Sequence, residues 1–409
     1  MTSPVLSAYD ACICPDLPDG ISCTDRAGSR CVSRLPKAHL HLHLTGGMRH
    51  ATLLDLARER GASLPERLTD ATPLHMDAPV SRRSWAKFQH LYDAARRQVD
   101  SPDVVARMIA EMCEDEAAEG SGWVELQVDP SGYAARFGGL HEVLDSLLDA
   151  AADASIATGV GVGIVVAANR TAHPQTAATL ARLAAMYAPG SRWGHDSVGR
   201  GVVSVVGFGL SNNEVLGPAE SFTQAFRIAR AAGLAAVPHA GELVGAHSVR
   251  AAVEHLGASR IGHGVRAVED PQLLELLAER GVAAEVCPSS NVALGVYADH
   301  AEVPINRLRN AGVPVALAAD DPLLFGSRLS AQYRAARDAH GIDDDGLADL
   351  ARDSIRASFA PEARRAELLA GVDRWAGTDP RDLRRCRPAT GITRTADIQI
   401  GGVLHHRWV

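Results

Sequence analysis

The sequence predicts an α/β protein with the architecture of a (β/α)8 TIM barrel, and two observations lead to this prediction. Between residues 35 and 376, eight short apolar runs alternate with amphipathic stretches of helical period. Continuous apolar strands separated by helices are typical of a parallel sheet covered on both faces, and eight such units indicate a barrel. The alternative is an open, doubly wound sheet, but no G-x-G-x-x-G motif follows the first strand.

The expected strands are short and apolar, and they cover residues 38–44, 123–129, 161–168, 202–210, 234–240, 259–264, 282–288 and 313–320. Amphipathic helices are expected between most neighbouring strands, at residues 102–119, 139–158, 174–188, 218–232, 246–256 and 269–280. This order places each helix between two strands, as a parallel barrel requires.

One domain is expected to span residues 35–376, between two irregular extensions. Residues 1–34 are rich in Pro, Gly, Asp and Ser and show no amphipathic period. Residues 377–409 are equally irregular and locally basic. Both segments are therefore predicted to stand outside the barrel.

The connection after the first strand, residues 45–101, is long enough to form an insertion with two helix-like pieces. One piece carries Trp85, Phe88 and Tyr92 on an apolar helical face. Two interpretations stay open for this face. It packs into the core, or it forms a helical lid over the mouth of the barrel.

Composition excludes several classes of protein. The formal net charge is −8, from 41 basic and 49 acidic residues, and such a chain without a long basic run is a poor binder of nucleic acid. No stretch reaches the roughly 20 apolar residues of a membrane helix, and the N-terminus lacks the features of a secretory signal. Seven scattered cysteines do not form a disulfide framework. We expect a cytoplasmic protein that binds neither nucleic acid nor membrane, and self-association into a homo-oligomer stays open.

Polar residues stand at the ends of four expected strands. Such positions recur at the first, fifth, sixth and eighth strands, which end in His41 and His43, His239, His263, and Asp320 and Asp321. Because the chemistry of a TIM barrel gathers at the carboxyl ends of its strands, these residues predict one active site.

Three histidines and one carboxylate of this set suit a metal ion. His39, His41 and His43 alternate along one strand and therefore point to the same face. With His239 and Asp320, the latter two histidines form a ligand set for Zn²⁺ that leaves a position for water. His39 lies deeper and is expected in the core or behind the ligands. The third to fifth strands contain no lysine that could bridge two metals, so one Zn²⁺ per chain is predicted.

Three further residues are placed to act on the water and on a bound substrate. A zinc ion would lower the pKa of its water to about 7. Glu242, three residues past His239, is better placed as a proton donor than as a ligand. His263 can orient or deprotonate the water, and Asp321 is expected to point away from Asp320, toward the substrate.

Five motifs occur in order, each at the end of a strand: PKAHLHLHLTG (36–46), HAGE (239–242), RIGHG (260–264), CPSSN (287–291) and DDP (320–322). Over roughly Leu35 to Trp375, the chain thereby resembles the adenosine deaminase family. The segment HLHLTGGMR and the Ala- and Arg-rich helices are similar to its actinobacterial adenosine deaminase-like group. The resemblance implies zinc-dependent hydrolytic deamination of a 6-aminopurine nucleoside.

Roles follow from the resemblance by position in the motifs. The implied zinc ligands are His41, His43, His239 and Asp320. Glu242 would protonate purine N1, His263 would activate or hold the hydroxide, and Asp321 would hydrogen-bond N7. Asp320 is also expected among the catalytic residues, and His43 among those that contact the substrate. The H-x-E…P-C-x-x-C signature of cytidine-type deaminases is absent.

The chain departs from the family pattern at two positions that would contact the substrate. The family's first motif usually ends in Asp-Gly, with the Asp on the 5′-hydroxyl, where this chain has Thr45 and Gly46. Asn212 stands where a Gly usually contacts purine N3. Adenosine is the expected substrate, but the missing carboxylate leaves room for a 5′-modified adenosine, an aminofutalosine-type nucleoside or AMP. Another metal-dependent hydrolase on the same barrel, or an inactive purine-binding relative, are the remaining alternatives.

Overall fold

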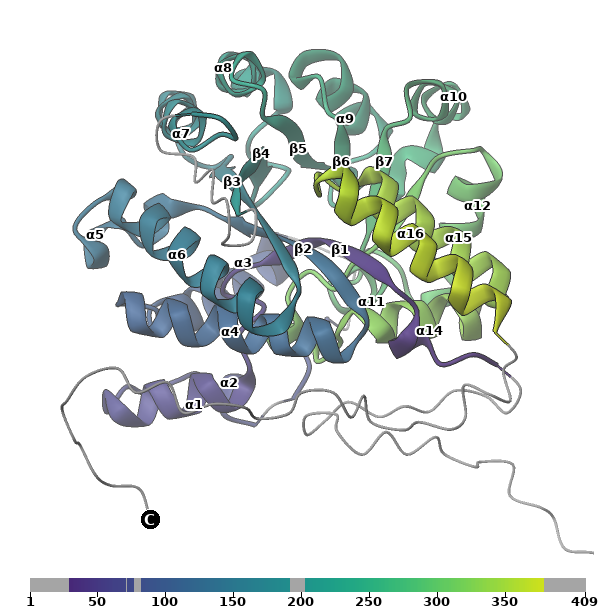
Figure 1. Cartoon of the computed structure of the whole chain (residues 1–409). Helices are drawn as coiled ribbons and strands as arrows, with labels where there is room; N and C mark the ends of the chain where they lie inside the picture. Colours follow the sequence, from purple (N-terminus) through teal and green to yellow (C-terminus); the bar gives the residue numbers. More distant parts are fainter. Residues whose placement is uncertain (1–28, 71, 77–81, 192–202, 379–409) are drawn as a thin grey trace, which may run out of the picture.

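The computed structural model describes residues 29–70, 72–76, 82–191 and 203–378. Eight parallel strands form one sheet in the chain order β1 to β8. The sheet closes on itself, because Leu42 pairs with Asp320 in a parallel bridge and the backbone N–H of His43 donates to the carbonyl of Asp320 over 3.1 Å. Figure 1 shows the helices arranged around this sheet. The predicted (β/α)8 barrel is confirmed.

The strands are β1 (Lys37–His43), β2 (Ser121–Val128), β3 (Gly161–Asn169), β4 (Ser204–Ser211), β5 (Ala235–Ala240), β6 (Arg260–His263), β7 (Ala283–Val286) and β8 (Val315–Leu317). The last three are shorter than the sequence predicts. β6 ends at His263, which adopts a φ of +63°, outside the extended region. β8 ends at Leu317, before Asp320, which has the same φ. β7 ends before Pro288, which occupies the first turn of the next helix.

The α-helices are α1 (His50–Glu59), α2 (Glu66–Thr69), α3 (Arg82–Arg96), α4 (Pro102–Ala118), α5 (Ala134–Phe137), α6 (Leu140–Thr158), α7 (Pro174–Met186), α8 (Thr223–Ala231), α9 (Ala246–Ala251), α10 (Pro271–Arg280), α11 (Pro288–Ala293), α12 (Ile305–Asn310), α13 (Pro322–Phe325), α14 (Leu329–His340), α15 (Asp344–Ala357) and α16 (Glu362–Gly377). Their boundaries follow ordinary capping rules. In α10, Asp270 accepts hydrogen bonds from two backbone N–H groups, Pro271 is the first residue, and Gly281 ends the helix in the left-handed conformation.

The expected insertion after the first strand is helical, since α1, α2 and α3 lie between β1 and α4. Trp85 and Phe88 of α3 are buried, with 8% and 7% of their surface exposed. The ring of Phe88 stacks on Phe325 of α13, with the centroids 5.8 Å apart. Helix α3 is therefore packed against α13, the short helix that follows β8.

The two predicted extensions, residues 1–34 and 377–409, lie almost entirely outside the described residues. Within the described part, Val32 is fully buried and Arg30 forms an ion pair with Asp344 over 3.3 Å. The packed chain thus begins a few residues before position 35. Among the described helices, none has the length and apolar character needed to cross a membrane.

Candidate active site

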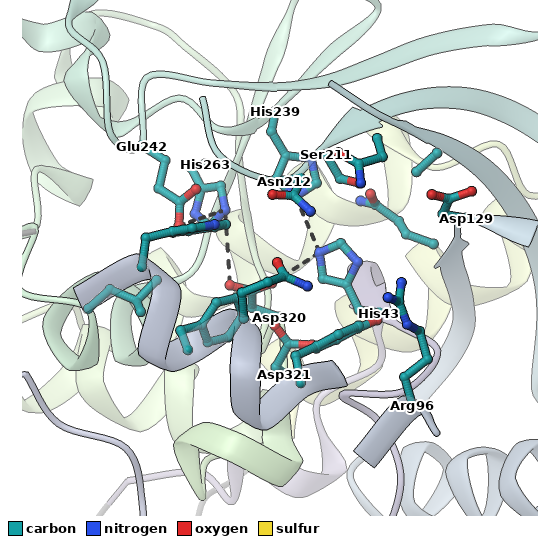
Figure 2. A pocket seen from close by; sticks show the side chains of 18 of the residues that line it. His43, Arg96, Asp129, Ser211, Asn212, His239, Glu242, His263, Asp320 and Asp321 are labelled. Atoms are coloured by element: carbon teal, nitrogen blue, oxygen red, sulfur yellow. Dashed lines mark hydrogen bonds and ion pairs between the residues drawn. The ribbon is translucent and has the colours of Figure 1, made fainter. Parts of the chain in front are cut away.

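A cavity opens at the carboxyl ends of the strands, and Figure 2 shows side chains from several strands pointing into it. The predicted residues that line it are His43, Trp85, Phe88, Tyr92, Asn212, His239, Glu242, His263, Asp320 and Asp321. His41 lies directly beneath, fully buried. The structure thus brings together residues from β1, α3 and the ends of β4, β5, β6 and β8.

The four predicted ligands meet at one point. Nε2 of His43 lies 3.2 Å from Nε2 of His239 and 3.3 Å from Oδ1 of Asp320. Nε2 of His41 lies 3.4 Å from the same oxygen and has no hydrogen-bond partner among the described residues. Donor atoms around a tetrahedral zinc, with bonds of about 2.0–2.1 Å, are separated by roughly 3.3 Å. The arrangement fits one metal ion.

Buried groups fix the orientation of the histidines of β1. Nδ1 of His41 is 2.8 Å from a carboxylate oxygen of Glu285, and the other oxygen accepts a hydrogen bond of 2.6 Å from Arg260. This contact places the proton on Nδ1 and leaves Nε2 free for a metal. His39 lies in the core as expected, with Nδ1 2.8 Å from Glu116. Glu285 and the role of Arg260 were not predicted, although a charged residue within an apolar strand was a usable signal.

Three residues of the site adopt a backbone conformation that is uncommon outside glycine. Among the described residues, the non-glycine positions with positive φ are Asn212 (78°), His263 (63°) and Asp320 (63°), and all three line the cavity. Such conformations cost of order 1–3 kcal/mol each and cluster at functional sites. The positive φ also explains why a glycine would suit the position of Asn212.

Glu242 and His263 lie next to each other beside the ligand set (Figure 2). Oε1 of Glu242 lies 3.6 Å from Nε2 of His263. Burial, followed by the charges of Asp320 and Glu214, raises the pKa of Glu242 well above its usual range. Burial lowers the pKa of His263 to about 3. The carboxyl group can therefore carry a proton at neutral pH while the imidazole stays neutral.

The CPSSN motif holds two of these residues in place. Ser290 donates a hydrogen bond of 2.6 Å to Oδ2 of Asp320, and the side-chain amide of Asn291 lies 3.3 Å from Nδ1 of His263. Both residues are fully buried in α11. The motif therefore holds the side chains of Asp320 and His263 in position.

Asp321 and Thr45 have different positions relative to the cavity. Asp321 lines it, and burial together with the charge of Asp320 raises its pKa well above the usual range. Thr45 is fully buried, and its hydroxyl is 2.6 Å from the hydroxyl of Tyr133. Tyr133 lines the cavity, whereas Thr45 is not among the lining residues. Thr45 thus reaches the cavity wall through Tyr133, and the expected effect of Thr45 on the substrate stays a prediction.

Helix α3 supplies another wall of the cavity. Trp85, Phe88 and Tyr92 all line it, and the rings of Tyr92 and His43 are 6.5 Å apart, edge to face. The two interpretations of this face are not exclusive, because Trp85 and Phe88 are buried, Tyr92 is partly buried, and all three border the site. Movement of α3 as a lid stays a prediction.

The end of the cavity that lies across from Glu242 and His263 is polar (Figure 2). Arg96 and Asp129 line it, and Arg96 also forms an ion pair of 2.7 Å with Asp93. Burial raises the pKa of Asp129, although Ser131 donates to its carboxylate. Asp129 was not predicted, because no spacing in the sequence connects it with the histidines.

Residues 36–375 match the sequence model of the family described as adenosine deaminase. The chain belongs to the adenosine deaminase family. It is thus an enzyme of the hydrolytic aminohydrolase type, as the five motifs indicated. Adenosine deaminase family members are metal-dependent.

Relatives within the adenosine deaminase family carry related names. A Streptomyces coelicolor protein, provisionally named adenosine/adenine deaminase, is 54% identical over 350 residues, 85% of this chain and 98% of that protein. The crystal structure of adenine deaminase from Arthrobacter aurescens superposes with a TM-score of 0.74 at 29% identity, over 84% of this chain and 99% of that one. An amidohydrolase from Burkholderia ambifaria, solved with bound zinc, gives a TM-score of 0.73 at 26% identity, over 84% and 92% of the chains.

Proposed function

We propose that this chain catalyses the zinc-dependent hydrolytic deamination of a 6-aminopurine, with adenosine or a closely related nucleoside as substrate. The products would be the 6-oxo purine and ammonia. The observation that carries the proposal is the convergence of three imidazoles and one carboxylate at 3.2–3.4 Å, beside a buried carboxyl group.

His41, His43, His239 and Asp320 would hold the zinc ion, one per chain. Bound zinc would supply a water molecule with a pKa lowered to about 7. The spacing of the four donor atoms and the unpartnered Nε2 of His41 support this assignment. The bound zinc in the Burkholderia amidohydrolase supports the choice of metal.

The remaining residues would carry the proton transfers. Neutral His263 takes the proton of the water as its oxygen bonds to C6. Protonated Glu242 donates its proton to purine N1, so that the electron pair of the C6–N1 double bond moves to nitrogen. His263 returns its proton to the 6-amino group, the C6–OH gives its proton to the carboxylate of Glu242, and the C6–N bond breaks, so that ammonia and the 6-oxo purine leave with both residues restored. Asp321, whose pKa is raised by burial and by the charge of Asp320, would in its protonated form donate a hydrogen bond to N7.

The polar end of the cavity supports a substrate with a substituent on N9. A purine whose N1 meets Glu242 would extend toward Arg96 and Asp129, where a ribose offers hydroxyl groups and free adenine offers none. The phosphate of AMP would meet the carboxylate of Asp129 and an arginine already paired with Asp93. Adenosine is therefore the first candidate. Adenine is the second, because the relatives' names include adenine deaminase.

The test is a substrate panel with the zinc-loaded enzyme: adenosine, 2′-deoxyadenosine, 5′-modified adenosines, AMP and adenine. Loss of absorbance as the 6-amino group leaves should be fastest, in kcat/KM, for adenosine. A preference for adenine would mean that the polar end of the cavity does not bind a ribose. A preference for AMP would contradict the argument that Asp129 and the already paired Arg96 disfavour a phosphate. Inertness toward every 6-aminopurine would overturn the proposal. The cytoplasmic location, the absence of a nucleic-acid partner and the oligomeric state remain predictions from the sequence.

A further inference from the structure

A buried carboxylate holds the turn that carries Glu242. Glu214 follows β4 and is only 4% exposed. Its Oε1 accepts the backbone N–H of Gly241 at 2.6 Å. Its Oε2 accepts the N–H groups of Glu242, Leu243 and Val244 at 3.0, 2.7 and 2.9 Å. One side chain thereby satisfies four successive donors of a turn that has no strand partner to receive them.

The turn depends on this acceptor because its own geometry is tight. Gly241 has a φ of +71°, and a Cβ atom there would come within 2.4 Å of Val249. The turn therefore reverses sharply between the end of β5 and α9. Hydrogen bonds from backbone N–H groups to a charged carboxylate are among the stronger ones in proteins. Ser248 of α9 adds a fifth donor, at 2.5 Å.

An arginine holds the preceding residues from the other side. Arg170, at the end of β3, is buried. Its guanidinium donates to the carbonyl oxygen of His239 and, over 3.3 Å, to that of Gly217. Its charge also interacts with the carboxylates of Glu214 and Glu242. The end of β5 and the turn after it are thus fixed by two buried charged groups that never enter the cavity lining.

We infer that Glu214 is a positioning residue that holds the Gly241–Val244 turn so that the carboxyl group of Glu242 stays aimed at the substrate. The inference rests on the proposed function of the same site. Glu214 acts in a second way through its charge, because it opposes ionisation of Glu242. A residue that served stability alone would change neither the turnover of folded enzyme nor its pH dependence.

The principal variant is Glu214→Gln, which keeps the shape but turns an amide N–H₂ toward backbone donors. Folded, zinc-loaded Glu214→Gln should lose on the order of 10²-fold in kcat, as expected for a displaced catalytic group, while KM changes little. The alkaline limb of the kcat/KM profile should move to lower pH, because one negative charge beside Glu242 is gone. The control is Glu220→Gln, the same exchange at an exposed position six residues on, and it should match the wild type.

A double-mutant cycle separates positioning from general destabilisation. If Glu214 acts through Glu242, adding Glu214→Gln to Glu242→Gln should cause almost no further loss of kcat. Additive losses would overturn the inference. If Glu214→Gln does not fold, Glu214→Asp replaces it: the charge stays, but the shorter side chain cannot reach all four N–H groups, so kcat should fall while the alkaline limb stays in place.

Wild-type kcat in Glu214→Gln or Glu214→Asp, or a loss that only tracks lost zinc, would refute the positioning role and leave the proposed function intact. If the wild-type enzyme deaminates no 6-aminopurine, the proposed function fails and the inference falls with it.

Discussion

The carboxylate of Glu285 lies 2.8 Å from Nδ1 of His41, although 244 residues separate the two in the chain. Arg260 in turn donates to Glu285 over 2.6 Å. The contact joins β7 to β1 through the interior of the barrel, directly beneath the predicted ligands. It turns Nε2 of His41 toward the position where a metal would lie.

Replacement of Glu285 by Gln should weaken zinc binding. The amide keeps the size of the side chain but loses the charge that makes His41 a better ligand, and changes of this kind lower metal affinity about 10–100-fold. Competition with a chelator measures the affinity. Glu279→Gln, an exposed exchange on α10, serves as the control. Unchanged zinc affinity in Glu285→Gln would show that zinc binding by His41 does not depend on its contact with Glu285.

Replacement of Glu242 by Gln should separate metal binding from turnover. The residue is not among the four donors that meet at 3.2–3.4 Å, so metal content should stay at the wild-type level. Loss of a general acid typically reduces kcat about 10²–10⁴-fold. His239→Ala provides the contrast, because it should lose zinc together with activity. A wild-type kcat in Glu242→Gln would show that Glu242 is not the proton donor.

The pH dependence of kcat/KM should include an alkaline limb that belongs to Glu242. Its pKa is raised well above the usual range, chiefly by burial, so the carboxyl group is protonated below that pKa and active as a donor. As the pH rises through it, the proton is lost and kcat/KM should fall. Assays across neutral and alkaline pH test this. Persistence of the same limb in the residual activity of Glu242→Gln would assign it to another group.

Replacement of Asp129 by Asn should affect nucleosides more than free adenine. Asp129 lines the polar end of the cavity, and its Oδ1 caps a short turn by accepting from Ser131, which an Asn can also do. The fold should therefore persist. We expect KM for adenosine to rise about tenfold, the effect of one lost charged hydrogen bond, with adenine kinetics unaltered. Equal changes for both substrates would place the N9 substituent elsewhere.

Conservative changes in α3 test whether its aromatic face contacts the substrate. Phe88 stacks on Phe325 and also lines the cavity, so Phe88→Leu should both lower Tm and raise KM. Trp85→Phe should raise KM and leave Tm nearly unchanged. The phenyl ring still packs in the core, but it covers less of the cavity wall than the indole. Thermal unfolding and steady-state kinetics on the same samples separate the two effects. A lowered Tm with unchanged KM in both variants would leave core packing as the only role.

The sequence predicted the barrel and the four converging donors because both depend on local pattern. His41, His239 and Asp320 stand at strand ends, and a closed parallel barrel brings all its strand ends to one face. The partners of Glu285 and Glu214 could not be assigned in this way, because they belong to other elements of the barrel and no spacing in the sequence records the pairing. The contact of Thr45 with Tyr133 could not be predicted for another reason: Thr45 lies past the end of β1, where strand alternation no longer fixes the direction of a side chain.

The left-handed backbone at Asn212, His263 and Asp320 implies a conflict between heat resistance and activity in this enzyme. Glycine would relieve the conformational cost at each of the three positions. At His263 and Asp320, however, glycine would also remove the groups on which the chemistry depends. Engineering aimed only at a higher melting temperature would therefore favour the replacements that abolish deamination, and Asn212 is the position of the three where the two aims are compatible.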